Sequence, residues 1–361
     1  MMSIRVEHIQ PAQIKDYESL VLADERSLVY SSLPYVELLK CLSPEAACLH
    51  WLARDETGAV RGSLICLIQK GPWGFIANVL PFFSGPAGLV VPDGDLAVKS
   101  ALLGHYLAEV RARGCVAATF VTSPLDVDSA RYHAWLAPTF VDERVGLITP
   151  LPPPSGGLEQ ALLEMCRQKT RPPIRKSLRV GFQLEVAGSE ENWSFLRATH
   201  RHNMAQLNAA ARPDAFFDYM RSPDSASLMR RLYVARLDGT PVAALLLLDH
   251  HRTVEYFVPV IVEAYRSLQP LSFLIFHAMR ESVEAGKRWW NWGGTGLTQS
   301  TLYRFKKGFG AVDHRYFYFV HLFDPALLRV DRQSLMTAYP FFFTYPFGQV
   351  PLSDSTSSGL V

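Results

Sequence analysis

The chain has 361 residues, which is long for a single hydrophobic core and favours two domains. Hydrophobic residues make up 48% of it and charged residues 19%, as in an ordinary soluble globular protein. The formal net charge of +2 provides no general attraction for long nucleic acids, so DNA is not an expected partner.

Cysteine usage and the N-terminal residues indicate the compartment. Five scattered cysteines without a CxxC pair predict neither a zinc site nor a disulfide framework, and they fit the reducing cytoplasm. Residues 1–10 lack the apolar core of a signal peptide. No stretch reaches the roughly 18 apolar residues that a membrane span needs. We therefore predict a cytoplasmic protein.

The first half of the chain contains a hairpin pattern followed by a helix and a strand. Two apolar runs, residues 51–54 and 63–68, flank a polar turn that carries glycine, which predicts two antiparallel strands. Apolar residues recur at helical spacing through residues 98–113. A β-rich run, residues 116–121, predicts the next strand.

The same order of elements recurs about 180 residues later. Residues 233–236 and 243–248 form a second hairpin pattern, and the first strand of both hairpins ends in Ala-Arg. A helical stripe at residues 271–283 and a strand at 288–292 follow. A glycine that can cap the helix, Gly114 or Gly286, lies between helix and strand in both halves. The repeat predicts two copies of one α/β domain, each with a central sheet flanked by helices.

The boundary between the two copies is a linker rich in proline and glycine, residues 149–157. It predicts a first domain at residues 1–155 and a second at residues 156–361. The polar segment 353–361, which is rich in serine and threonine, is expected to be a flexible tail.

The segment from Trp289 to Gly310 carries the strongest chemical signal. An aromatic strand ends on Gly293 and Gly294, where the backbone can approach a ligand closely because no Cβ intervenes. A basic segment then supplies aromatic and cationic side chains, among them Tyr303, Arg304, Lys306 and Lys307. Amides beside fixed positive charge suit a phosphorylated ligand or the oxyanion of an acyl transfer. The alternative is an aromatic strand and a basic turn with only a structural role.

The densest positive run of the chain lies at residues 168–179. Two prolines break the preceding helix and can start a new one, which would place Arg175 and Arg179 one turn apart on one face. Arginine forks match phosphate oxygens, so Arg171, Arg175 and Lys176 are candidates to bind a phosphorylated ligand. The alternative is a solvated cationic surface.

Glu255 is the only carboxylate in the strand pattern at residues 252–260. If it is buried, its pKa rises, and it becomes a candidate general base for an attacking amine. The alternative is a side chain that points to solvent or pairs with an arginine.

Two other patterns carry less chemical information. The dispersed histidines, including His200 and His202, have no metal-ligand spacing, so no metal site is predicted. The aromatic segment at residues 339–347 is expected to pack over its domain as a closing flap, with an acceptor or lipid-facing surface as the alternative.

Taken together, these segments resemble the Fem-type branch of the GNAT acyltransferase superfamily, whose members carry two tandem GNAT-like domains and include peptidoglycan-bridge aminoacyltransferases. The likeness is strongest at residues 169–182 and at 289–311, where Leu-Tyr-Arg-Phe-Lys-Lys-Gly-Phe-Gly looks like that family's closing motif. Residues 78–86 are similar to a substrate-lining loop of the first domain. The resemblance implies that Lys306 lies where the acyl carbonyl is attacked and stabilises the oxyanion.

Two departures from related patterns bear on the donor. Residues 262–270, where acetyl-CoA-using GNAT domains place a glycine-rich pyrophosphate loop, contain no glycine. No heptad pattern marks the long helical hairpin by which some bridge enzymes engage transfer RNA. Acyl-CoA and aminoacyl-tRNA therefore both stay open as donor substrates, and a short tRNA contact stays open as well.

The resemblance implies an acyltransferase that moves an acyl or aminoacyl group from a thioester or an ester to an amine. The expected acceptor is a phosphorylated sugar, a nucleotide-sugar-like molecule or a cell-envelope precursor. Lys306 would stabilise the oxyanion and Glu255 would accept the proton, with no metal or bound cofactor, and the oligomeric state is open. The alternative from another class is a non-catalytic binding or scaffold protein that kept the duplicated fold.

Overall fold

The computed structural model describes residues 3–80, 88–126, 128–186, 188–295 and 300–349. The predicted tail at 353–361 and most of the predicted loop at 78–86 lie outside these residues. The chain folds into two units, of which the first contains Met1–Asp24, Ser43–Glu143 and Tyr316–Val361, and the second contains Glu25–Leu42 and Arg144–Arg315.

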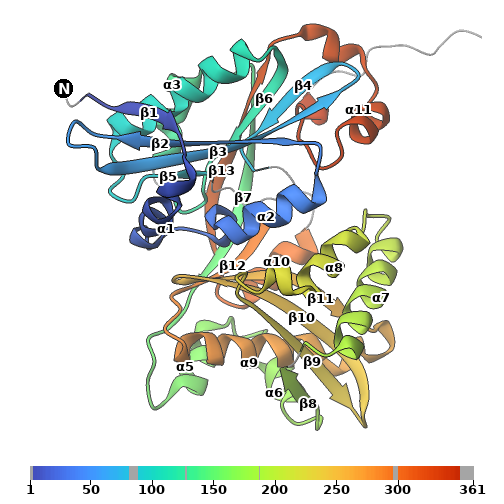
Figure 1. Cartoon of the computed structure of the whole chain (residues 1–361). Coiled ribbons are helices and arrows are strands. Elements are labelled where there is room, and N and C mark those ends of the chain that lie inside the picture. The colour runs from blue at the N-terminus through green and yellow to red at the C-terminus, as the bar shows by residue number, and fades with distance from the viewer. Residues whose placement is uncertain (1–2, 81–87, 127, 187, 296–299, 350–361) are drawn as a thin grey trace, which may run out of the picture. The chain divides into compact units, whose positions relative to one another are not determined.

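The first unit is built on a mixed sheet with helices packed on it (Figure 1). Its strands are β1 (Arg5–His8), β2 (Ala47–Arg54), β3 (Val60–Gly71), β4 (Gly74–Asn78), β5 (Leu89–Val90) and β6 (Cys115–Val121). The order is β1-β2-β3-β4-β6, in which only β4 and β6 run parallel, and β5 pairs with β3. Its helices are α1 (Ile14–Ala23), α3 (Leu96–Ala112), α4 (Ser129–Leu136) and α11 (Arg332–Ala338), with short 3-10 helices η1 (Pro11–Gln13), η5 (Pro325–Arg329) and η6 (Phe347–Gln349).

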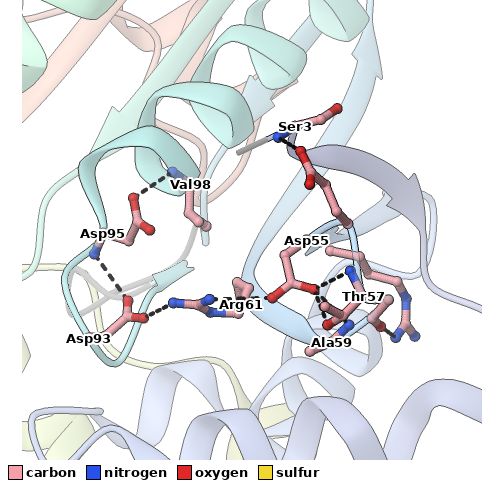
Figure 2. Close-up of polar contacts among 11 residues, drawn as sticks. Ser3, Asp55, Thr57, Ala59, Arg61, Asp93, Asp95 and Val98 are labelled. Carbon is pink, nitrogen blue, oxygen red and sulfur yellow. Dashed lines mark hydrogen bonds and ion pairs between the residues drawn. The ribbon is translucent and has the colours of Figure 1, made fainter. Parts of the chain in front are cut away.

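The turn of the first hairpin is tied to the start of α3 by carboxylates and an arginine (Figure 2). Asp55 closes the turn by accepting two main-chain N–H groups, and it also accepts from Arg61 at 3.3 Å. The same guanidinium pairs with Asp93. Asp95 is the N-cap of α3 and accepts from the Val98 amide at 3.3 Å. The hairpin and the helix that covers the core are thus fixed to each other.

The second unit repeats this sheet and helix arrangement. Its strands are β7 (Phe140–Pro150), β8 (Gln183–Val186), β9 (Arg230–Leu237), β10 (Thr240–His250), β11 (Thr253–Ile261) and β12 (Trp289–Thr295). The order is β8-β9-β10-β11-β12-β7, and only β11 and β12 run parallel. Its helices are α2 (Leu33–Leu42), α5 (Leu158–Met165), α6 (Arg171–Ser177), α7 (Glu190–Gln206), α8 (Asp214–Arg221), α9 (Pro270–Glu284) and α10 (Ser300–Gly308), with 3-10 helices η2 (Val29–Ser31), η3 (Pro223–Ser225) and η4 (Glu263–Leu268).

The helices of the second unit cover its sheet on both faces (Figure 1). Helix α9 packs on β9, β10 and β11 together with α5 and α6, and this layer contains the buried core with Trp290 and Trp292. Helices α7 and α8 lie on the opposite face, where α2 packs against α8.

The predicted duplication is confirmed. The two hairpins are β2–β3 and β9–β10, and the first strand of each ends in Ala-Arg, at Ala53-Arg54 and Ala235-Arg236. Both hairpins form the second and third strands from the edge of their sheets. In both units a helix and then a strand parallel to the fourth strand follow. Gly114 and Gly286 follow the two equivalent helices with φ of 69° and 74°, the left-handed conformation that glycine adopts readily.

The two units exchange strands. Residues 145–150 of β7 pair with β12 in the second unit. Residues 318–322 of β13 (Val312–Leu322) pair antiparallel with β6 in the first unit. The units therefore differ from the predicted domains 1–155 and 156–361, because residues 25–42 and 144–155 belong to the second unit and residues 316–361 to the first.

The aromatic C-terminal segment packs in the first unit. Tyr339 is fully buried, and its hydroxyl donates to the Gly74 carbonyl at 2.9 Å and accepts from the Trp73 amide at 3.2 Å. The Asn78 side chain bonds to both main-chain groups of Phe343. The segment is thus packed, as the sequence favoured, but on the first unit and not over the predicted second domain.

Candidate functional site

Glu255 lies in β11 and is 1% exposed. Its Oε2 accepts a hydrogen bond from the Tyr30 hydroxyl at 3.1 Å. Asn291, its partner in the parallel strand β12, also bonds to it. Burial raises the pKa of Glu255 to about 8, against the opposing effect of these two hydrogen bonds. The solvent-facing alternative is thereby excluded, and the raised pKa that a general base needs is present.

Further buried polar and aromatic groups surround this carboxyl. Tyr30 and Tyr35 pack edge to face at 5.0 Å, and Tyr35 packs in the same way on Phe257 at 6.4 Å. The Arg212 guanidinium lies 4.3 Å from the centre of the Phe257 ring, and burial lowers its pKa to about 10, so it stays charged at neutral pH. We call Glu255, Tyr30, Tyr35, Arg212 and Asn291 the Glu255 cluster.

Sequence reasoning missed most of the Glu255 cluster. Tyr30 comes from η2, 225 residues before Glu255 in the chain. It belongs to the second unit because residues 25–42, although early in the sequence, pack with that unit. No periodic pattern in residues 25–42 indicates that they pack with the second unit. From the sequence, Glu255 was therefore the one member of the cluster that could be identified as a candidate.

Lys306 lies in α10 and is 4% exposed. Its ammonium donates to the Thr295 hydroxyl at 2.9 Å and to the Gly294 carbonyl at 3.2 Å. Burial lowers its pKa to about 8. Since an ammonium has three N–H donors, these two bonds leave one without a partner among the described residues.

Strand β12 carries the partners of both candidate catalytic residues. Asn291 bonds to Glu255, and its Oδ1 also accepts from the Gly293 amide at 2.9 Å. Gly294 accepts from Lys306. Asn291 and Gly294 are three residues apart, or about 10 Å along an extended strand. The hydrogen-bonding partners of Glu255 and Lys306 thus lie three residues apart on one strand.

The basic segment after β12 is the helix α10 and not a turn. Phe305 and Phe309 recur one helical turn apart and both pack on the Trp292 ring, which explains the helix. The Tyr303 hydroxyl donates to Asp313 at 2.7 Å, so it is already bonded within the protein. Arg304 is exposed and has no side-chain hydrogen bond or ion pair within the described residues.

The two segments with the strongest family resemblance touch each other. Gly308, the last residue of α10, lies so close to Thr170 that a Cβ at this glycine would overlap the Thr170 Oγ1. The Gly308 carbonyl also accepts from the Arg167 amide at 2.9 Å. A glycine is therefore required here for close approach of the helix end to the basic run.

The residues of the basic run, 168–179, make two different kinds of contact. The Arg171 guanidinium donates to the carbonyls of Glu164 and Cys166, both at 2.9 Å, and so caps the C-terminal end of α5. Arg171 is not among the residues that line the cavity of Arg175, Lys176 and Arg179, and its role toward a ligand stays a prediction. Arg175 and Lys176 do line a cavity of about 440 Å³, which also contains Arg179.

The cavity beside α6 lies near the start of α9. Lys176 Nζ donates to the Ser267 carbonyl at 3.0 Å, in the 3-10 helix η4 that directly precedes α9. The solvated-surface alternative stays open, because Arg175, Lys176 and Arg179 are all exposed. All three nevertheless line one hollow, so their role in phosphate binding stays a prediction.

Comparison with known proteins places this fold. Residues 165–307 match the family described as an acetyltransferase (GNAT) domain. The structure is similar to that of FemX, with a TM-score of 0.72 and 14% identity over 90% of this chain and 99% of that one. It is also similar to the C-terminal domain of a putative lysylphosphatidylglycerol synthetase from Agrobacterium fabrum (TM-score 0.53, 16% identity, 90% and 96% covered). A third similar structure is that of a tandem GNAT protein from the clavulanic acid biosynthesis pathway, with a TM-score of 0.52 and 12% identity over 90% of this chain and 99% of that one.

Residues 165–307 therefore match a GNAT acetyltransferase domain, and the chain as a whole has a fold similar to that of FemX and of the tandem GNAT protein. No curated protein sequence matches it significantly. Among the described residues, no group of His, Cys, Asp and Glu is arranged to hold a metal ion. In the same part of the chain, no helix has the length and apolar character to cross a membrane.

Proposed function

We propose that the second unit transfers an acyl or aminoacyl group from a thioester or ester donor to an amine of a phosphorylated acceptor. The observation that carries this proposal is the buried ammonium of Lys306, which lies beside the glycine pair of β12 and has one N–H donor without a partner among the described residues. A fixed positive charge in a dry site stabilises the oxyanion that forms when an amine attacks an acyl carbonyl.

The reaction then needs a proton acceptor. Glu255 Oε1 is buried and has no hydrogen-bonding partner within the described residues, so it can accept the proton of the attacking amine. With its pKa at about 8, the basic carboxylate form becomes more populated as the pH rises. Lys306 loses its charge over the same range, which predicts a rate that is highest near pH 8.

The similar structures support two kinds of donor. The tandem GNAT protein of the clavulanic acid pathway is described in a form without acetyl-CoA, and this link to acetyl-CoA supports an acyl-CoA donor. The resemblance of residues 289–311 to the Fem-type closing motif and the similarity to the putative lysylphosphatidylglycerol synthetase domain support an aminoacyl group and an acceptor of the cell envelope. Arg175 and Lys176 supply the charge for a phosphorylated acceptor, such as a nucleotide-sugar.

A ligand screen followed by a transfer assay tests this function. Acetyl-CoA, longer acyl-CoAs, aminoacyl-tRNA and UDP-linked sugars would be compared by thermal shift, since a ligand at 100 times its Kd stabilises the folded state by about 2.7 kcal/mol. Each donor that binds would then be incubated with the acceptors, and the acylated product would be measured by mass spectrometry. Binding without any acylated product would favour the alternative of a non-catalytic binding protein.

Variants of Arg175 locate the acceptor. Arg175→Ala should weaken binding of a UDP-linked sugar by about 1.5–3 kcal/mol, because it removes a charge-assisted contact. Arg171→Ala is the matched control, since its guanidinium caps α5 and does not line the cavity. Equal affinity in wild type and Arg175→Ala, with both folded, would leave only the solvated-surface interpretation.

A further inference from the structure

A second basic cavity lies in the same unit, away from the candidate site. It has a volume of about 490 Å³ and is formed by the proline run Pro150–Pro154, by Arg252 in the β10–β11 turn and by residues 286–289 before β12. It lies where the parallel strands β11 and β12 begin. The Lys306 partners Gly294 and Thr295 lie at the other end of β12, about 20 Å along the strand from Trp289.

The walls of this cavity are held together by the main chain. The Arg288 amide donates to the Arg252 carbonyl at 2.8 Å, and the Trp289 amide donates to the same carbonyl at 3.1 Å. The Leu151 amide donates to the Arg288 carbonyl at 2.9 Å. Three segments that are distant in sequence are thus fixed to one another, so the cavity is preformed.

The cavity collects positive charge without an acidic residue in its lining. Its charged side chains are Arg252, Lys287 and Arg288. Arg288 is paired with Glu25 at 2.8 Å, whereas Lys287 makes a single bond to the His251 carbonyl at 3.0 Å. Arg252 Nη1 donates to the Gly286 carbonyl at 3.3 Å. Two of the three cations therefore retain N–H donors.

The Arg252 side chain also has a buried N–H donor. Arg252 Nε is buried and has no hydrogen-bonding partner within the described residues, which is unfavourable for a charged donor. Burial lowers the pKa of the Lys287 ammonium, and the nearby Arg231 and Arg252 lower it further against the opposing effect of Asp249. An anion in this cavity would accept from the accessible N–H groups of Arg252 and would offset the charge repulsion on Lys287.

We propose that this cavity binds the phosphate or diphosphate group of a small phosphorylated molecule. The fork of Arg252 matches phosphate oxygens, and Lys287 adds a second charge from the opposite loop. The volume lies within the range of small-molecule sites. The site lies outside the Lys306 region, so its ligand is additional to the acceptor phosphate that we assign to Arg175 and Lys176.

Pyrophosphate is the probe for this site. Calorimetric titration at constant ionic strength should give saturable binding to the wild type. Lys287→Gln and Arg252→Gln should each raise the Kd about tenfold or more, as expected for loss of a charge-assisted hydrogen bond. Arg175→Gln, in the other basic cavity, is the matched control and should retain this component of binding. Affinity that is unchanged in both Lys287→Gln and Arg252→Gln would overturn the proposal.

Lysine labelling locates the bound anion independently of any variant. Acetylation of surface lysines, mapped by mass spectrometry, should be slowed at Lys287 by pyrophosphate and unaffected by an equal ionic strength of sodium chloride. Protection confined to Lys176 would place the anion in the other cavity and would refute this site. The labelling also keeps the test decisive if Arg252→Gln fails to fold, because it uses the wild-type protein.

Discussion

Arg54 and Arg236 make the same pair of contacts at the same position of two different sheets. Arg54 bonds to Glu7 at 2.9 Å and to the Gly58 carbonyl at 2.7 Å. Arg236 bonds to Glu185 at 2.8 Å and to the Gly239 carbonyl at 3.0 Å. In both units the arginine closes its hairpin turn and ties the hairpin to the edge strand. It also holds the pKa of its glutamate partner below the usual value through that hydrogen bond.

Arg236→Met should lower the free energy of unfolding by about 1–2 kcal/mol, because it removes a largely buried guanidinium with several partners. Arg266→Met is the control, since Arg266 pairs with Glu263 on the surface with both side chains more than half exposed. Arg266→Met should lower the free energy of unfolding by less than about 0.5 kcal/mol. Urea denaturation of the two variants checks the difference, and equal midpoints would contradict a structural role for Arg236.

Gly308→Ala should destabilise the protein by about 1–3 kcal/mol, because the added methyl group overlaps Thr170 Oγ1. Thr170→Ala removes that oxygen, so the double variant should recover much of the loss. Gly104→Ala is the control within helix α3, where a Cβ meets no atom within 4 Å, and it should stabilise by about 0.5–1 kcal/mol. Additive effects of the Gly308 and Thr170 changes in a thermal melt would refute the contact.

Lys306→Met should reduce turnover about 10²–10³-fold, the scale that follows loss of one oxyanion donor. KM should change much less, since the contact strengthens mainly in the transition state. Lys307→Met is the matched control, because its neighbouring ammonium pairs with Asp313 at 3.1 Å and lies nearer the surface. Full turnover per folded molecule in Lys306→Met, combined with a lower melting temperature, would instead assign this lysine a structural role.

Glu255→Gln should change how stability depends on pH. The pKa of Glu255 is raised from 4.5 to about 8, so between these values the folded protein holds a proton that the unfolded chain has released. The contribution of Glu255 is therefore fully present below about pH 4.5 and is lost as the pH rises to about 8. Unfolding free energies at several pH values would be compared, and the wild type should lose a few kcal/mol relative to the variant across this window. Parallel curves would contradict the raised pKa.

The repeated sheets could be predicted from the sequence because their signals are local. A hairpin needs two apolar runs and a turn, and a helix needs a short periodic stripe, so both copies are visible within about 60 residues. Glu255 stood out as the one carboxylate of an apolar strand, but the sequence left open whether its side chain is buried, and the structure buries it. Lys306 was found through the resemblance of its segment to the Fem-type closing motif, and its catalytic role remains a prediction.

The parts that sequence reasoning missed depend on contacts between distant segments. Nothing in the pattern around Tyr30 indicates that it bonds to Glu255, because residues 25–42 and β11 are brought together only by the tertiary fold. Arg171 was assigned to a ligand because its use as a helix cap depends on the position of α5. The exchange of β7 and β13 was missed for a related reason, since an aromatic strand pattern does not specify its neighbour.

The exchange of β7 and β13 has a consequence for biosynthesis. A ribosome releases β6 nearly 200 residues before it releases β13, since β6 ends at Val121 and β13 starts at Val312. Until then, the β6 edge of the nascent first unit is unpaired and can recruit other strands. A polypeptide interrupted after residue 311 would keep that open edge permanently. A chain that terminates prematurely, late in translation, should thus aggregate through the exposed edge of β6, which lies far in sequence from the missing residues.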